Sequence, residues 1–241
     1  KQEIARLYRE NRNLMKEDIF GEDERELYYQ TTVKMDDVTA QDSLRNLSEW
    51  MERYYGKKVI ILLDEYDTPM QEAYVQGYWD EFTAFVRSLF NASFKTNPYL
   101  ERAIMTGITR VSKESIFSDL NNLQVITTTS DLYADCFGFT ESEVFHVLDE
   151  FGMGDKKDEV KQWYDGFTFG EHKDIYNPWS ITNYLDKRKT YPYWASTSSN
   201  GLVSRLIRTA SADVKEKMED LLNGREIVVS FDEQILSLIH I

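Results

Sequence analysis

The sequence predicts an α/β fold, with a parallel sheet in residues 1–137 and an α-helical part after about Gly138. Three short apolar runs, at Val59–Leu63, Arg102–Thr109 and Gln124–Ser130, are predicted strands, and helical material separates them. Continuous apolar strands joined by helices are typical of parallel sheets that are covered on both faces. After Gly138 the apolar residues recur mostly at helical spacing, so the second part is predicted to be α-helical apart from a loop in "YDGFTFGEHKDIYNPWS".

The composition is that of a globular protein with an acidic surface. The 241 residues carry 42 acidic and 28 basic side chains, a net charge of −14, which argues against a broad nucleic-acid surface. The single cysteine, Cys136, excludes an internal disulfide and suits a reducing compartment, so we expect a cytoplasmic protein. No signal peptide is visible, and Val59–Leu63 is the longest purely aliphatic run, so no membrane contact is expected.

Residues 1–56 are predicted to be mostly helical. In "DDVTAQDSLRNLSEWMERYYG" an apolar face recurs at helical spacing, with Thr39 as the expected N-cap and Gly56 as the stop. The stretch "ELYYQTTVKM" favours a strand by its Tyr, Thr and Val content, although the alternation is not clean. Between the first two strands, "YWDEFTAFVRSLFNASF" places its large apolar residues on one helical stripe.

The second part carries two helix-start signals. Thr140 is the expected cap of "FTESEVFHVLDEFG", with Glu143 completing a capping box, and Asn177-Pro178 begins another helix. A dense aromatic set is expected to be buried: Trp163, Tyr164, Trp179 and Trp194. The last six residues, 236–241, follow no pattern of the preceding chain and match a translated sequencing adapter, so we expect them to be an artefact.

An acidic motif follows the first strand in "KKVIILLDEYDTPM". A carboxylate at the end of a rigid apolar strand can help to hold Mg²⁺, and an adjacent one can deprotonate an attacking water. Asp64 fits the metal role and Glu65 the catalytic-base role. The alternative is that both acids only solvate the end of a strand. Asp67 is the next candidate for the base, or a turn residue ahead of Pro69, and the turn role is favoured.

The second strand ends in "TGITR", which supplies further candidates. Thr106 and Thr109 are placed to bond a γ-phosphate or its water, and Arg110 to meet a phosphate of its own or of a neighbouring subunit. The alternative is that these are an ordinary strand threonine pair and a surface arginine. The three histidines share no metal-ligand spacing, and no serine or cysteine nucleophile motif is present.

Six motifs occur in one order: "KKVIILLDEYDTPMQEAYVQGYWDE", "TGITRVSKESIFSDLNNLQV", "FGFTESEV", "WYDGFTFG", "IYNPWSITNYL" and "YWASTSSN". Together they resemble the bacterial AAA-ATPase-like family, P-loop NTPases that often carry a PD-(D/E)XK nuclease-like domain at the C-terminus. The resemblance covers about residues 1–235. It implies a partial P-loop NTPase-like sheet followed by a helical lid-like domain in 138–235, with ATP and Mg²⁺ as cofactors.

The resemblance also implies residue roles. Asp64 and Glu65 become the Walker B pair, with the metal at Asp64, and Thr106 or Thr109 lies close to the sensor position. Asn177 and Pro178 would lie in the lid near the nucleotide base. It further implies that "ELYYQTTVKM" is helical, against its composition.

One element of such a site is missing from the sequence. The chain contains no G-x-x-x-x-G-K-[ST] loop to cradle phosphates, so we expect a fragment that lacks the Walker A loop and does not hydrolyse ATP alone. In the intact protein the leading interpretation is an ATP-binding and hydrolysing regulatory module. The competing one is a non-hydrolysing, nucleotide-sensing module that positions a nuclease-like partner. A homo-oligomer is left open.

The resemblance also predicts how the strands pair. Val59–Leu63 should pair in parallel with Ala103–Thr109. A loop-bearing strand, which this chain lacks, should lie between Ala103–Thr109 and Val125–Thr129.

Overall fold

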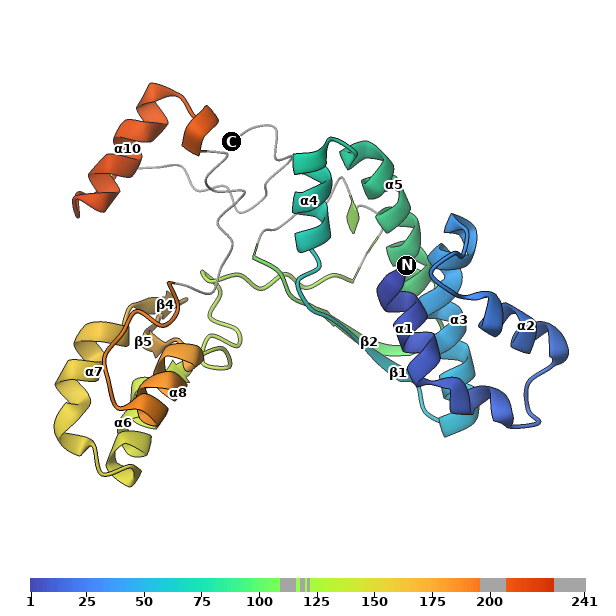
Figure 1. Cartoon of the computed structure of the whole chain (residues 1–241), viewed down its shortest axis with the longest axis horizontal. Helices are drawn as coiled ribbons and strands as arrows, with labels where there is room; N and C mark the ends of the chain where they lie inside the picture. The colour runs from blue at the N-terminus through green and yellow to red at the C-terminus, as the bar shows by residue number, and fades with distance from the viewer. Residues whose placement is uncertain (109–115, 118–119, 121, 196–206, 228–241) are drawn as a thin grey trace. The chain divides into compact units, whose positions relative to one another are not determined.

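The computed structural model describes residues 1–108, 116–117, 120, 122–195 and 207–227. These residues divide into two compact units (Figure 1). The first unit holds the described residues up to 122 together with 207–227, and the second holds 123–195. The division falls upstream of the one predicted after residue 137.

Three helices and a short 3₁₀ turn build the N-terminal part of the first unit. They are α1 (Gln2–Glu10), η1 (Arg12–Lys16), α2 (Glu22–Gln30) and α3 (Asp37–Tyr55). Their apolar faces share one buried cluster, which includes Tyr8, Leu14, Tyr28, Leu47 and Trp50. The mostly helical prediction for this region is therefore confirmed. Because α2 contains "ELYYQ", the first half of "ELYYQTTVKM", and residues 31–35 contain a bend and a turn, the strand interpretation is wrong and the helical one holds for the first half only.

The ends of α3 show one correction and one confirmation. The N-cap is Asp36, not Thr39: an Asp36 carboxylate oxygen accepts the backbone N–H of Thr39 at 2.7 Å. Thr39 is instead the third residue of the helix, the position whose N–H a cap normally binds. Gly56 ends the helix in the left-handed conformation with φ 66°, as its expected role as the stop requires.

Strands β1 (Val59–Leu63) and β2 (Leu100–Met105) pair in parallel, with Ile61 opposite Ala103 and Leu63 opposite Met105. This confirms the predicted parallel pairing, although β2 ends earlier than expected. The connection runs through α4 (Thr68–Gln76), α5 (Trp79–Phe90) and a π turn, η2 (Asn91–Lys95). Met70, Val86 and Phe90 are buried from this side, and Leu63 and Met105 of the strands pack against them.

The opposite face of this sheet is open to solvent. The exposed fractions of Ile60, Leu62 and Ile104 are 60%, 72% and 51%. The expected cover on both faces is therefore absent among the described residues. The alternating exposure along β1 shows that the helices of the connection cover only one face.

The predicted third strand is wrong. Residues 124–130 are irregular, with a turn at 128–129, and they join no strand ladder. Ser130 donates its backbone N–H to the Thr127 carbonyl at 3.0 Å, and the Thr127 N–H bonds the Ser130 hydroxyl oxygen at 3.1 Å. Such local bonds from hydroxyl side chains compete with strand pairing, which the content of branched residues does not reveal. The position of a further strand beside this segment stays a prediction.

The second unit combines helices with a small antiparallel sheet of order β3-β5-β4. Its elements are β3 (Phe139–Thr140), α6 (Glu141–Glu150), η4 (Gly154–Lys156), α7 (Lys157–Tyr164), β4 (Phe167–Phe169), β5 (His172–Tyr176) and α8 (Pro178–Lys187). The prediction that the second part contains only helices and a loop is therefore wrong in part. The segment "FTFGEHKDIY", expected to be a loop, is a hairpin that turns at Gly170, where φ is 54°.

Both predicted helix starts in this unit are confirmed. Thr140 and Glu143 form the capping box of α6. Asn177 caps α8 by accepting the Ser180 N–H at 3.0 Å, and Pro178 is the first helical residue.

The aromatic prediction fails for three of its four members. Tyr164 is buried, but Trp163, Trp179 and Trp194 are 49%, 54% and 53% exposed. Trp163 and Tyr164 are neighbours on α7, and successive helical residues point about 100° apart, so one buried aromatic turns the next one outward.

A last described helix, α10 (Ala212–Leu222), has no buried residue. Among the residues that the structure describes, no helix is both long and apolar enough to cross a membrane.

Candidate functional site at the carboxyl ends of β1 and β2

Asp64 and Thr106 follow the two parallel strands directly, and the structure brings them together. The Thr106 hydroxyl donates to a carboxylate oxygen of Asp64. The backbones continue the pairing beyond the strands: the Thr106 N–H donates to the Leu63 carbonyl, and the Tyr66 N–H to the Thr106 carbonyl, both at 2.9 Å. The sheet therefore holds an acid and a hydroxyl at its carboxyl edge, where ligands bind in open α/β sheets.

Glu65 occupies an unusual backbone conformation. Its φ is 51°, in the left-handed region that residues other than glycine seldom adopt. Its N–H lies 3.1 Å from an Asp64 carboxylate oxygen and 3.3 Å from the Thr106 hydroxyl oxygen, and these contacts help to hold the turn. The side chains of Asp64 and Glu65 are both exposed. Left-handed residues of this kind cluster at functional sites, where surrounding contacts maintain the strain.

Asp67 is a buried structural residue and not only a residue of a turn. Its exposed fraction is 1%, and one carboxylate oxygen accepts the Ile108 N–H at 3.1 Å and the Gln71 side-chain amide at 2.9 Å. It thereby ties the start of α4 to the backbone that follows β2.

Gly107 makes this approach possible. A Cβ atom added there would lie 2.7 Å from an Asp67 carboxylate oxygen and 2.7 Å from a ring carbon of Tyr66. Real Cβ atoms do not approach that closely, so the glycine of "TGIT" is required by packing, not by its φ. Sequence reasoning thus missed Gly107, and it missed the structural role of Asp67, which it considered only as a second base candidate or a turn residue.

The structure does not test the other predicted site residues. Thr109 and Arg110 lie outside the described residues. Asn177 and Pro178 belong to the second unit, where they begin α8. Their expected nucleotide contacts stay predictions.

The donor set at this edge suits a hard cation. Mg²⁺ prefers oxygen ligands, usually one or two carboxylates together with substrate phosphates and water. The Asp64 carboxylate and Thr106 hydroxyl are oxygen donors of this kind, so the residues present fit the metal that the sequence predicts.

The second unit holds a different acidic cluster. Glu141, Asp165 and Asp174 place carboxylate oxygens within 4.8 Å of one another. Lys161 lies among them: its ammonium contacts Glu141 and lies 3.4 Å from Asp174 and 3.8 Å from Asp165. Burial, then the neighbouring Asp174, raises the pKa of Asp165. Because Lys161 already contacts all three carboxyl groups and offsets part of their negative charge, we interpret the cluster as an internal ion-pair network.

Comparison with known proteins identifies the first unit. The family model described as "Predicted AAA-ATPase" matches residues 4–117, which include β1, β2 and the whole candidate site. This segment belongs to the AAA-ATPase-like family, and the resemblance is confirmed there.

A protein of Azotobacter chroococcum mcd 1, "Uncharacterized protein in vnfD 5'region", is 33% identical over 146 residues. The match covers 60% of this chain but only 28% of that protein, so the chain spans less than a third of the relative's length. No solved structure matches the chain significantly.

Proposed function

We propose that this chain is the metal-and-water half of an ATP-binding and hydrolysing regulatory module, a nucleoside-triphosphate phosphohydrolase. The observation that carries the proposal is the contact between Asp64 and Thr106 at the carboxyl edge of a parallel strand pair, within the family-matched segment. In P-loop NTPases an acid at the end of a strand helps to hold Mg²⁺, and Asp64 occupies such a position with its carboxylate bonded by Thr106.

Each side chain has a distinct role in this proposal. Mg²⁺, when bound with ATP, neutralises the charge of the phosphates. Asp64 would hold the metal, and the Thr106 hydroxyl fixes the orientation of that carboxylate. Glu65 would accept a proton from the attacking water, and its exposed position leaves it free to reach one. Asp67 is buried and already accepts two hydrogen bonds, which makes it a poor base.

The other expected contributions extend the same proposal. Thr109 would act as a sensor of the γ-phosphate, Arg110 would meet a phosphate, and Asn177 and Pro178 would approach the nucleotide base from a lid. The 241 residues contain no Gly-rich loop, so the phosphate cradle would come from elsewhere in a longer protein. A C-terminal nuclease-like domain, a homo-oligomeric partner and a cytoplasmic location belong to the same proposal.

The test uses the longer protein with its complete nucleotide site. Glu65→Gln should lower the rate of ATP hydrolysis by about 10²–10⁴-fold, the usual contribution of a general base, and should leave ATP binding intact. Asp64→Asn should weaken Mg²⁺-dependent binding or turnover. Glu72→Gln on α4, another exposed glutamate, is the matched control and should change neither. Unchanged turnover in Glu65→Gln would remove Glu65 from the base role.

A non-hydrolysing interaction module is the second candidate, and two observations favour it. The sequence lacks a phosphate-binding loop. The second unit also has three exposed tryptophans, which could meet a partner. Calorimetric titration of this chain with Mg-ATP should show no tight binding, because too few backbone N–H donors are present to hold a triphosphate. A micromolar dissociation constant for this chain would contradict the proposed division of the site. An absence of turnover in a longer protein with an intact loop would favour the interaction module.

A further inference from the structure

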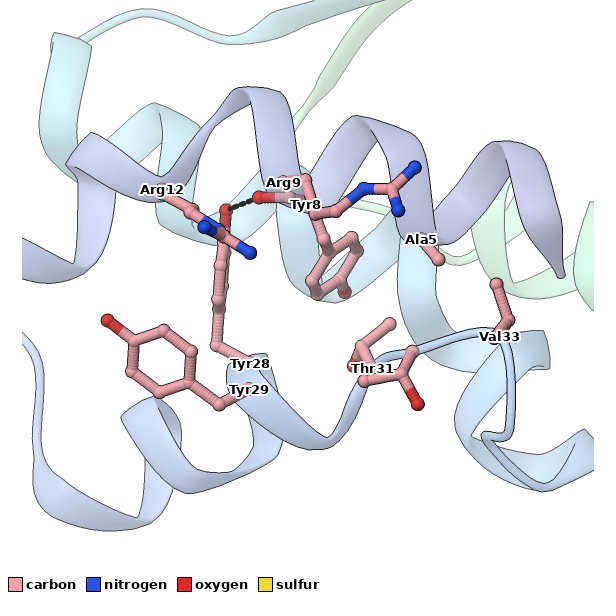
Figure 2. A pocket seen from close by; sticks show the side chains of 9 residues that line it. Ala5, Tyr8, Arg9, Arg12, Tyr28, Tyr29, Thr31 and Val33 are labelled. Carbon is pink, nitrogen blue, oxygen red and sulfur yellow. Dashed lines mark hydrogen bonds between the residues drawn. The ribbon is translucent and has the colours of Figure 1, made fainter.

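A small open cavity lies between α1 and the end of α2 in the first unit. Its volume is about 170 Å³. Figure 2 shows Tyr8, Arg9 and Arg12 reaching it from the α1 side, and Tyr28, Tyr29, Thr31 and Val33 from α2 and the segment after it. The complete lining is Ala5, Tyr8, Arg9, Arg12, Tyr28, Tyr29, Thr31, Thr32 and Val33.

The floor of the cavity is apolar and held in place by hydrogen bonds. The Tyr8 hydroxyl donates to the Ser43 carbonyl at 2.7 Å, and the Tyr28 hydroxyl donates to the Tyr8 carbonyl at 2.5 Å. The two rings lie 4.8 Å apart between centroids, and both residues are 2% exposed. These two buried rings therefore form a fixed wall behind the cavity, and the apolar surface open to a ligand comes from Tyr29 and Val33, which are 59% and 51% exposed.

The rim carries positive charge without an acid. None of the nine lining residues is acidic, although the chain has 42 acidic residues and a net charge of −14. Among the described residues, neither Arg9 nor Arg12 forms an ion pair. Arg6, on the same helix but outside the lining, does so with Glu3 at 2.6 Å and Glu10 at 4.0 Å. The two arginines at the cavity therefore keep their hydrogen-bond donors available for an anion.

We propose that this cavity binds a small organic acid with a compact aromatic body, such as a benzene-carboxylate. A cavity of about 150 Å³ lined by apolar side chains accommodates benzene, so this cavity is large enough for one ring and too small for a nucleotide. The ring would lie against the exposed apolar lining of Tyr29 and Val33, and the carboxylate would accept charge-assisted hydrogen bonds from Arg9 or Arg12. The inference uses none of the residues of the proposed ATPase site, so the two can fail independently.

The test titrates this chain with sodium benzoate, followed by calorimetry and by NMR of methyl groups. We expect saturable binding that shifts the Ala5 and Val33 methyl signals, because both residues line the cavity. Benzamide, which has the same ring but no charge, and acetate, which has the charge but no ring, should each bind at least about tenfold more weakly. Equal binding of benzoate and benzamide would overturn the role of the arginines, and absence of saturable shifts would overturn the site.

Variants locate the anion. Arg9→Gln with Arg12→Gln should weaken benzoate binding at least about tenfold, whereas Arg6→Gln, the matched change on the same helix, should leave it unaltered. Circular dichroism verifies that each variant keeps its helices. Added sodium chloride should weaken benzoate binding in the unmodified chain, so a salt-independent affinity would contradict the proposal even if the double variant failed to fold.

Discussion

The two sheets of this molecule use similar apolar residues in opposite ways. In β5 of the second unit, Ile175 and Tyr176 are 2% and 0% exposed. In β1 of the first unit, Ile60 and Leu62 are 60% and 72% exposed, although the strand is a continuous run of Val, Ile and Leu. Strands of that composition are normally buried on both faces, whereas an antiparallel sheet can stay open on one side. In this molecule the parallel pair of strands is open to solvent on one face, and the apolar end of β5 in the antiparallel sheet is buried.

This difference indicates where further contacts belong. The second unit buries its small sheet against its own helices through one cluster, which includes Val144, Leu148 and Val160. The first unit covers one face of β1 and β2, and the described residues leave the other face open. Exposed apolar surface next to a candidate site is typical of a place where more protein packs. We therefore expect the open face to be covered in the longer protein.

The largest expected effect comes from one truncation in each sheet. Ile175→Ala should lower the free energy of unfolding of the second unit by about 2–5 kcal/mol, because it leaves a cavity in a buried site. Leu62→Ala, at an exposed position, should change the stability of the first unit by less than about 0.5 kcal/mol. Urea unfolding followed by tryptophan fluorescence measures both.

The same two variants can contradict the proposed difference between the two sheets. Similar losses for the two variants would show that the open face of β1 is covered in solution. In the longer protein, Leu62→Ala should become as costly as Ile175→Ala if the proposed covering exists. A negligible cost there as well would leave the open face as a genuine surface.

A smaller effect separates the acids at the carboxyl edge of the open sheet. Asp67→Asn should lower stability by about 1–3 kcal/mol, because a neutral amide oxygen accepts more weakly than a carboxylate from the Ile108 N–H and the Gln71 amide, and an NH₂ group replaces the second buried oxygen. Asp64→Asn, at an exposed position, should cost less than about 0.5 kcal/mol. Differential scanning calorimetry compares them, and an equal loss of thermal stability would show that Asp67 does not tie the edge together.

The features that could be predicted from the sequence were those determined by contacts between residues close together in the chain. Gly56, the Thr140–Glu143 box and the Asn177-Pro178 start act within one helical turn, and all were predictable from sequence. Most of the errors depended on contacts that no local pattern contains. The strand expected at Gln124–Ser130 was lost to hydroxyl-to-backbone bonds, and the tryptophans were misjudged because aromatic density does not indicate which face a helix presents.

In the candidate site, too, the local features could be predicted and the long-range ones could not. An acid after an apolar strand is a local signal, so Asp64 and Glu65 could be proposed from sequence, and Thr106 joined them once parallel pairing was assumed. The approach of Asp67 to Gly107 spans about forty residues and depends on the absence of a Cβ atom, so only the folded backbone reveals it. The left-handed turn at Glu65 likewise has no signal in the side-chain sequence.

The smallest expected effect tests the charge balance of the closed sheet. Around Asp165 lie Glu141 of α6, Lys161 of α7 and Asp174 of β5, and the pKa of Asp165 is raised by burial and by Asp174. A carboxyl group whose folded-state pKa is raised favours folding most when it is protonated. Stability should therefore fall as the pH rises from the unfolded-state value, about 3.9, through the folded-state one.

Asp165→Asn removes that titration and should make the second unit slightly more stable at neutral pH, by less than about 1 kcal/mol because solvent screens part of the repulsion. The gain should vanish below about pH 3.9, where the carboxyl group is protonated in both states. Glu171→Gln, the same charge change at an exposed position, should show no such pH dependence. Unfolding midpoints between pH 3 and 8 measure this, and a loss of stability at neutral pH would show that the contact of Asp165 with Lys161 outweighs its repulsion by Asp174.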